Sequence, residues 1–107
     1  MSQITVEKPL PAQLAAMGVQ DWPVWTKEVS TFGWYYDVSE TAYILAGEVV
    51  VTPKGGTPVH FEAGDLVTFA SGLDCVWEIR QPLRKHYLLD GSLLGRIYRR
   101  AKLALKL

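Results

Sequence analysis

The stretch EVVVTPKGGTPVHF, residues 48–61, decides how this chain folds. Two short apolar runs, rich in β-branched residues, flank the cluster PKGG from Pro53 to Gly56. A Pro/Gly cluster between two such runs is typical of a β-hairpin. The pattern therefore predicts two antiparallel strands joined by a tight turn.

The rest of the chain continues this pattern outward from the hairpin. From Trp22 onward, short apolar segments alternate with turn residues, and further turns are expected at EAGD (62–65) and SGLD (71–74). Regular spacing of this kind predicts an all-β sandwich or barrel. The expected strand segments are WPVWTKEVS, TFGWYYDVS, TAYILAGEVVVTP, TPVHFEAG, DLVTFASG and CVWEIRQPLRKHYLL.

Two segments have helical signals instead. Near the start, Pro11 can open a short helix that Gly18 ends. From Ser92 the apolar residues recur at helical spacing, which predicts an amphipathic C-terminal helix. We therefore expect a barrel domain over residues 1–91 and a basic amphipathic helix over residues 92–107.

Composition limits the class of protein. A chain of 107 residues fits one domain, and 49% apolar with 21% charged residues is typical of an ordinary globular protein. No run reaches the roughly 18 apolar residues of a membrane span, and the start MSQITVEKPL lacks a signal-peptide pattern. The single cysteine, Cys75, cannot form an internal disulfide. We expect a cytoplasmic protein without a membrane span.

Charge is distributed unevenly along the chain. Residues 1–83 hold four Lys/Arg against ten Asp/Glu, whereas residues 84–107 hold seven against one. A basic amphipathic tail can dock on the acidic barrel, lie on an anionic membrane or bind an acidic partner. Docking is favoured over membrane binding because nothing in the barrel supplies a second membrane signal. Nucleic-acid binding is disfavoured because the acidic residues 1–83 would repel the phosphates.

Two motifs carry a resemblance to a known family. Glu40 and Gly47 keep the spacing that ends the first cupin motif, and EAGDLVTFASGLDC follows the second motif with Gly64, Asp65 and Gly72. The chain resembles a small single-domain cupin over about residues 5–89. Its sequence is most similar to the subgroup named for the cupin domain of ureidoglycine aminohydrolase.

The resemblance implies a double-sheet jelly-roll β-barrel with a central pocket, often dimerised through edge strands. It also implies a changed site. Typical cupins carry metal-binding histidines where this chain has Trp34, Tyr36 and Cys75, beside the retained Glu40. Indole cannot ligate a divalent metal, and a phenol must first lose a proton near pH 10. We therefore expect no metal and no cofactor.

The expected pocket consists of aromatic residues around one acid. Strand alternation places Trp34 and Tyr36 on one face, which points inward if the cupin register holds, and Glu40 joins them. The phenol of Tyr36 is then a suitable partner for the Glu40 carboxylate. The pocket residues predicted are Trp34, Tyr36, Glu40, Cys75 and Trp77.

Each of these residues also has a structural explanation. The aromatics can simply fill the barrel as core, and a glutamate outside the cupin register would lie in solvent. Cys75 is most simply an inert buried thiol. His86 is expected to be a satisfied structural histidine, and His60, beside the hairpin, is expected to be exposed.

Three function classes remain open at this point. The first is a cupin that binds a small polar or cationic molecule, in which the aromatics stack on it and Glu40 orients it. The second is a metal-dependent enzyme of the aminohydrolase type, and the third is a partner-binding structural module. The sequence identifies no catalytic residue, so whether the protein is an enzyme stays undecided. A small-molecule ligand and a homodimer are the expected partners.

Overall fold

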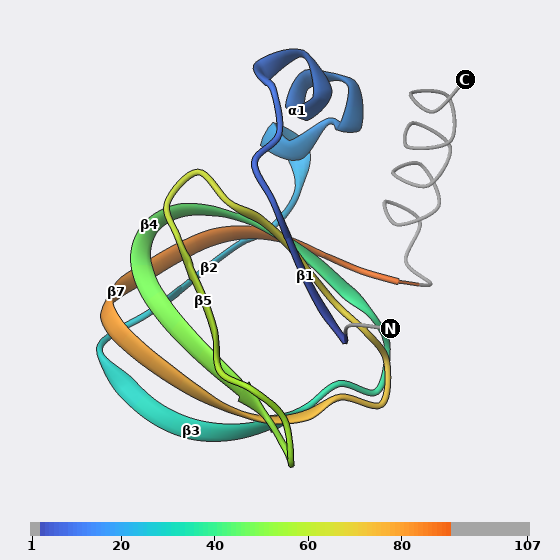
Figure 1. The fold of residues 1–107 in the computed structure, drawn as a ribbon. Helices are drawn as coiled ribbons and strands as arrows, with labels where there is room; N and C mark the ends of the chain where they lie inside the picture. Colours follow the sequence, from blue (N-terminus) through green and yellow to red (C-terminus); the bar gives the residue numbers. More distant parts are fainter. Residues whose placement is uncertain (1–2, 91–107) are drawn as a thin grey trace.

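The computed structural model of the protein describes residues 3–90 and forms a β-barrel with one helical cap (Figure 1). The predicted C-terminal helix over residues 92–107 lies outside the described residues. The elements are β1 (Ile4–Glu7), α1 (Pro11–Met17), a 3-10 helix (Val19–Asp21), β2 (Val24–Lys27), β3 (Ser30–Tyr35), β4 (Glu40–Pro53), β5 (Val59–Glu62), β6 (Leu66–Phe69) and β7 (Asp74–Leu89).

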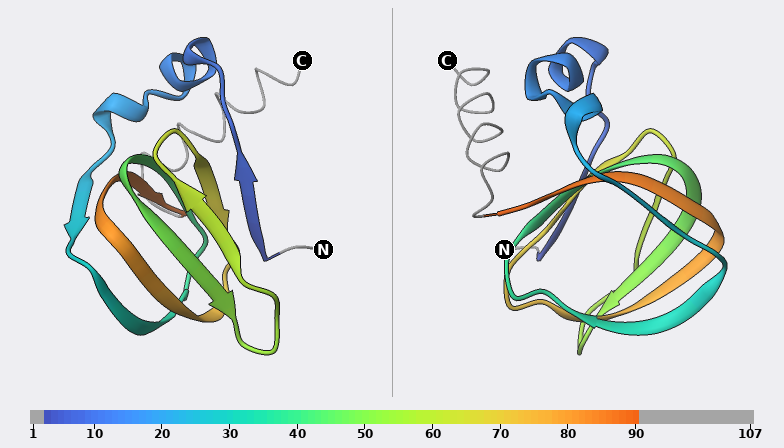
Figure 2. Two further views of the ribbon diagram at one scale, coloured as in Figure 1. Left: turned by 60° about the vertical axis from the view of Figure 1, so that its left-hand side comes forward. Right: turned by 180° about the vertical axis from the view of Figure 1, so that it is seen from behind.

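Two long strands, β4 and β7, hold the barrel together. They pair antiparallel along almost their whole length, and each also pairs with different neighbours at its two ends. One half of the barrel has the order β1-β6-β4-β7-β2, and in the other half β5 pairs with β4 and β3 pairs with β7. Figure 2 shows both long strands curving from one half into the other. The expected double-sheet jelly-roll is confirmed.

Gly47 lies where β4 bends. Its φ is +108°, and the pairing with β7 shifts register on both sides of it. A Cβ atom here would lie 2.7 Å from the Pro82 carbonyl oxygen and 2.9 Å from the Leu83 Cα. Only glycine fits such a conformation and such a close approach. The glycine of the first motif is therefore needed for the bend.

The predicted hairpin is formed by β4 and β5, with Val49 opposite Phe61 and Val51 opposite Val59. Val49, Val51 and Phe61 are fully buried, so one face of the hairpin belongs to the barrel core. Because successive side chains of a strand point to opposite faces, Val49 and Val51 share the inward face of the hairpin with Phe61.

The short helix α1 begins at Pro11 and ends at Gly18, as predicted, with Gly18 left-handed at φ +67°. Met17 packs with Trp22 and Leu88 in a small second core at one end of the barrel. The strand β1 was not predicted. It is a four-residue edge strand that pairs with β6, about sixty residues away in the sequence, so no local signal announces it.

None of the helices between residues 3 and 90 has both the length and the apolar character needed to cross a membrane.

Candidate functional site

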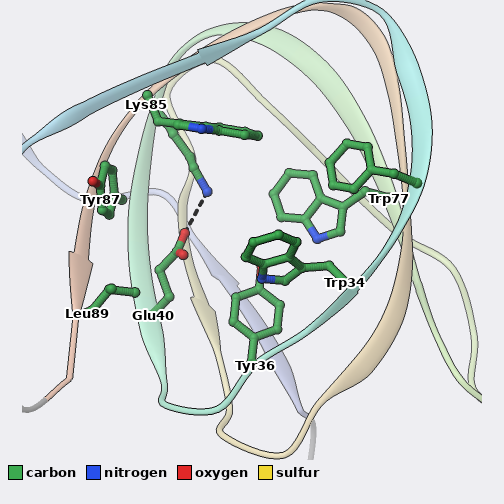
Figure 3. Close-up of a pocket in the computed structure, with 9 residues that line it drawn as sticks. Trp34, Tyr36, Glu40, Trp77, Lys85, Tyr87 and Leu89 are labelled. Atoms are coloured by element: carbon green, nitrogen blue, oxygen red, sulfur yellow. Dashed lines mark hydrogen bonds and ion pairs between the residues drawn. The ribbon is translucent and has the colours of Figure 1, made fainter.

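The barrel contains a cavity of about 220 Å³ between β2, β3, β4 and β7 (Figure 3). Most of its lining is aromatic, and a single carboxylate and a single ammonium are its charged groups. The lining residues are Trp25, Phe32, Trp34, Tyr36, Glu40, Trp77, Lys85, Tyr87 and Leu89.

The charged groups form a buried ion pair. The Nζ atom of Lys85 donates to Oε2 of Glu40 over 2.6 Å, although the two residues are 45 positions apart in the sequence. Glu40 is 7% exposed and Lys85 is 5% exposed. The cross-strand pairing of β4 with β7 brings them together, because both strands contribute their inward faces here. A buried charge-assisted hydrogen bond of this length fixes both side chains.

Aromatic rings surround the Lys85 ammonium. Its Nζ atom lies 5.0 Å from the centre of the Trp25 ring and 4.9 Å from that of Trp77, with Phe69 at 6.0 Å. A cation over an aromatic face gains roughly 0.5 to 2 kcal/mol, and more when water is excluded. The cage and Glu40 together compensate for removing this ammonium from water.

Tyr36 lies at the floor of the cavity and does not bond Glu40, which corrects the expected Tyr36–Glu40 pair. Its ring stacks on Phe69 with the centres 4.9 Å apart and contacts the edge of Trp34. Burial, and then the negative charge of Glu40, raise the pKa of the Tyr36 hydroxyl above its ordinary value. The phenol is therefore neutral wherever the protein is folded near neutral pH.

Trp77 contributes an unusual polar atom to the wall. Its indole N–H is fully buried and forms no hydrogen bond of acceptable geometry to any described residue. The Tyr36 hydroxyl and the Cys75 thiol lie near it, and their interaction with the indole lowers the pKa of each group slightly against the larger effect of burial. A buried donor without a partner costs about 1–3 kcal/mol, so a small adjustment that brings the N–H onto one of these two groups is favoured.

Cys75 does not line the cavity. It is buried in the core, and its thiol donates to the Trp34 carbonyl over 3.5 Å. Burial, with the nearby Asp74 carboxylate, raises the pKa of the thiol, which keeps it protonated and weakly nucleophilic. Of the five pocket residues predicted, the structure places Trp34, Tyr36, Glu40 and Trp77 around the cavity.

Comparison with known proteins identifies the family. Residues 14–87 match the model of the EutQ-like cupin domain. The chain belongs to the EutQ-like cupin family. A DUF861 family protein from Thermotoga maritima is 52% identical, with 81% of this chain and 99% of that chain covered and a TM-score of 0.80. No curated protein matches.

More distant structures share the fold of this EutQ-like cupin. An ethanolamine utilization protein Q from Salmonella typhimurium is 17% identical, with 82% of this chain and 58% of that chain covered and a TM-score of 0.57. An acireductone dioxygenase from Bacillus anthracis, with a cadmium ion in its active center, is 15% identical over 87% of this chain and 80% of that chain, with a TM-score of 0.58. These matches do not establish the ureidoglycine aminohydrolase subgroup.

The metal site common in cupins does not fit the residues of this one. The matching positions hold an indole, a phenol, a carboxylate and a thiol, and the carboxylate of Glu40 is already neutralised by Lys85. A divalent ion beside Glu40 would meet the ammonium as a like charge. The thiol of Cys75 points to the Trp34 carbonyl rather than into the cavity.

A different group of possible metal ligands lies on the outer face of the β4–β5 hairpin. Donor atoms of Glu48, His60 and Glu62 all lie within 4.8 Å of one another, and His60 Nε2 is 3.1 Å from Glu48 Oε2. His60 is exposed, as predicted. These three side chains could offer a zinc ion three ligands, with further positions open to water.

Sequence reasoning missed Lys85, the residue that pairs with Glu40. The sequence signal for it was present, because every second residue at several positions of β7 points inward. Lys85 continues this series, which includes Cys75, Trp77, Ile79 and Leu83. Trp25, Phe32, Tyr87 and Leu89 were also not assigned to the cavity. Nδ1–H of His86 donates to the Trp22 carbonyl over 2.9 Å, which agrees with a structural role.

Proposed function

We propose that this EutQ-like cupin binds a small organic molecule inside its barrel without a metal in the pocket. The aromatic side chains are the walls, and the Glu40–Lys85 pair is the polar anchor. The observation that carries this proposal is a buried ion pair that faces a cavity of about 220 Å³.

Physical reasoning favours a binding site over a simple core. Replacing a buried ion pair by well-packed apolar residues is often neutral or stabilising, so such a pair is weak evidence for a purely structural role. A charged pair beside a cavity of this size is typical of small-molecule sites, which combine apolar walls with a few polar groups.

The test is a fragment-binding experiment followed by NMR of the tryptophan indole N–H resonances. We expect neutral aromatic fragments to shift the Trp25, Trp34 and Trp77 signals in the wild type. The double variant Glu40→Gln/Lys85→Met keeps the side-chain shapes and should lose most of that binding. Arg84→Ala, an exposed change on the same strand, is the matched control.

The proposal fails if no fragment of a chemically diverse set perturbs the three indoles at millimolar concentration. It also fails if the double variant binds as well as the wild type, because the ion pair would then not be the anchor.

We also propose that the protein acts as a homodimer in the cytoplasm. On its outer face, the edge strand β3 leaves Tyr35 56% exposed, and Val76 on the adjacent β7 is 48% exposed. An apolar patch on an edge strand favours self-association. Sedimentation at micromolar concentration should show a species of twice the 12.0 kDa chain, and a purely monomeric species would contradict this.

A further inference from the structure

We infer that the ligand of the cavity is an uncharged planar ring that carries a hydrogen-bond donor next to an acceptor, as a lactam does. This inference rests on the proposed function and narrows it to one chemical class. It follows from the charges, the unused hydrogen-bonding atoms and the size of the cavity.

The charges of the pocket disfavour an ionic ligand. Glu40 and Lys85 neutralise each other, so the pair presents a dipole and not a net charge. A ligand cation would meet the Lys85 ammonium, which already occupies the faces of the Trp25 and Trp77 rings. A ligand anion would meet the Glu40 carboxylate. Because Glu40 and Lys85 are themselves buried, water screens these repulsions poorly, whereas a neutral dipolar molecule avoids them. The cationic ligand considered from the sequence is therefore disfavoured.

The unused polar atoms define what the ligand must offer. Only Oε2 of Glu40 is hydrogen-bonded within the described part of the chain, so Oε1 can accept from a ligand donor. The Lys85 ammonium has three protons and gives one of them to Glu40. The remaining N–H groups can donate to a ligand acceptor. Because Glu40 and Lys85 are in direct contact, the ligand donor and acceptor must also be adjacent.

The walls and volume set the shape. The cavity of about 220 Å³ is larger than the roughly 150 Å³ cavity known to hold benzene. Flat rings line it, including Trp34 and Phe32, and such rings pack best against another planar group. One or two fused rings fit this space.

The experiment compares four probes of similar size by NMR titration of the full-length protein. The probes are 2-pyridone, N-methyl-2-pyridone, benzylammonium and benzoate. We expect 2-pyridone to bind most tightly. N-methylation removes the donor to Glu40 and should weaken binding about tenfold or more, because hydrogen bonds to charged groups are the strong ones. Both ions should bind still more weakly.

Matched variants connect the preference to the ion pair. In Glu40→Gln/Lys85→Met, which removes both charges, the difference between 2-pyridone and its N-methyl derivative should fall to less than threefold. Arg84→Ala should retain the wild-type ranking.

Each other outcome overturns the inference. If benzylammonium or benzoate binds as tightly as 2-pyridone, the ligand class is wrong although a binding pocket exists. If the two pyridones bind equally, the donor is irrelevant. If none of the four binds but fragments of another class do, the inference fails and the proposed function stands. If no fragment of any class binds, both fail.

Discussion

Removing the Lys85 ammonium should destabilise the protein strongly, because Lys85→Ala leaves the Glu40 carboxylate buried without its partner. The pair is 2.6 Å long, and the two side chains are 6% and 9% exposed. Breaking one side of a buried pair costs about 3–5 kcal/mol. That is a large share of the roughly 5–15 kcal/mol of a typical domain. Denaturant unfolding should therefore show a midpoint well below that of the wild type at unchanged slope.

A double-mutant cycle separates the pair from the single side chains. Glu40→Gln/Lys85→Met should be markedly more stable than Lys85→Ala, because no uncompensated charge remains. Lys85→Ala removes three methylene groups and the ammonium from the side chain. The space that these atoms leave matches propylammonium in size and charge. Adding propylammonium should raise the unfolding midpoint of Lys85→Ala, whereas propanol at the same concentration should not.

The reasoning is refuted if Lys85→Ala unfolds within about 1 kcal/mol of the wild type, the range expected for an exposed pair. Arg84→Ala gives that reference on the opposite face of β7. Lack of any difference between propylammonium and propanol would show that the cage does not recognise a cation.

Three further predictions concern the bend, alkaline stability and metal binding. Gly47→Ala should lower the free energy of unfolding, measured with urea, by about 2–5 kcal/mol through backbone strain and steric overlap. Gly55→Ala, at φ +72° with open space around it, should lower it by only about 1 kcal/mol. Similar losses in the two variants would contradict the argument. Because burial raises the pKa of Tyr36 above 10.0, the folded state holds its proton longer than the unfolded state, so stability falls as pH rises above about 10. Tyr36→Phe should reduce that fall by up to about 1.4 kcal/mol per pH unit, and an unchanged slope between pH 10 and 11.5 would rule this out. Elemental analysis of untagged protein should find no metal whose content falls in the Glu40→Gln variant. Any zinc present should instead be lost in His60→Ala. Zinc that depends on Glu40 would disprove the proposal that the pocket holds no metal.

The barrel was predictable because its signals are local. The PKGG turn, the helix from Pro11 to Gly18 and the alternating apolar segments each depend on residues within a few positions of one another. Glu40 and Gly47 were recognised through motif spacing, which also is a property of neighbouring residues. Strand β1 had no such signal, since its partner β6 lies far away in the sequence.

The chemistry of the pocket was decided by the tertiary structure. Sequence alone identified an aromatic site around Glu40. The alternation of inward and outward residues along β7 could have predicted that Lys85 points inward. No local rule, however, pairs residues that are 45 positions apart. That contact depends on the register between β4 and β7, which is set along the whole strand pair. The sequence therefore determined the barrel and the acid in it, whereas the folded chain decided that an ammonium in an aromatic cage, and not the Tyr36 phenol, is the partner of that acid.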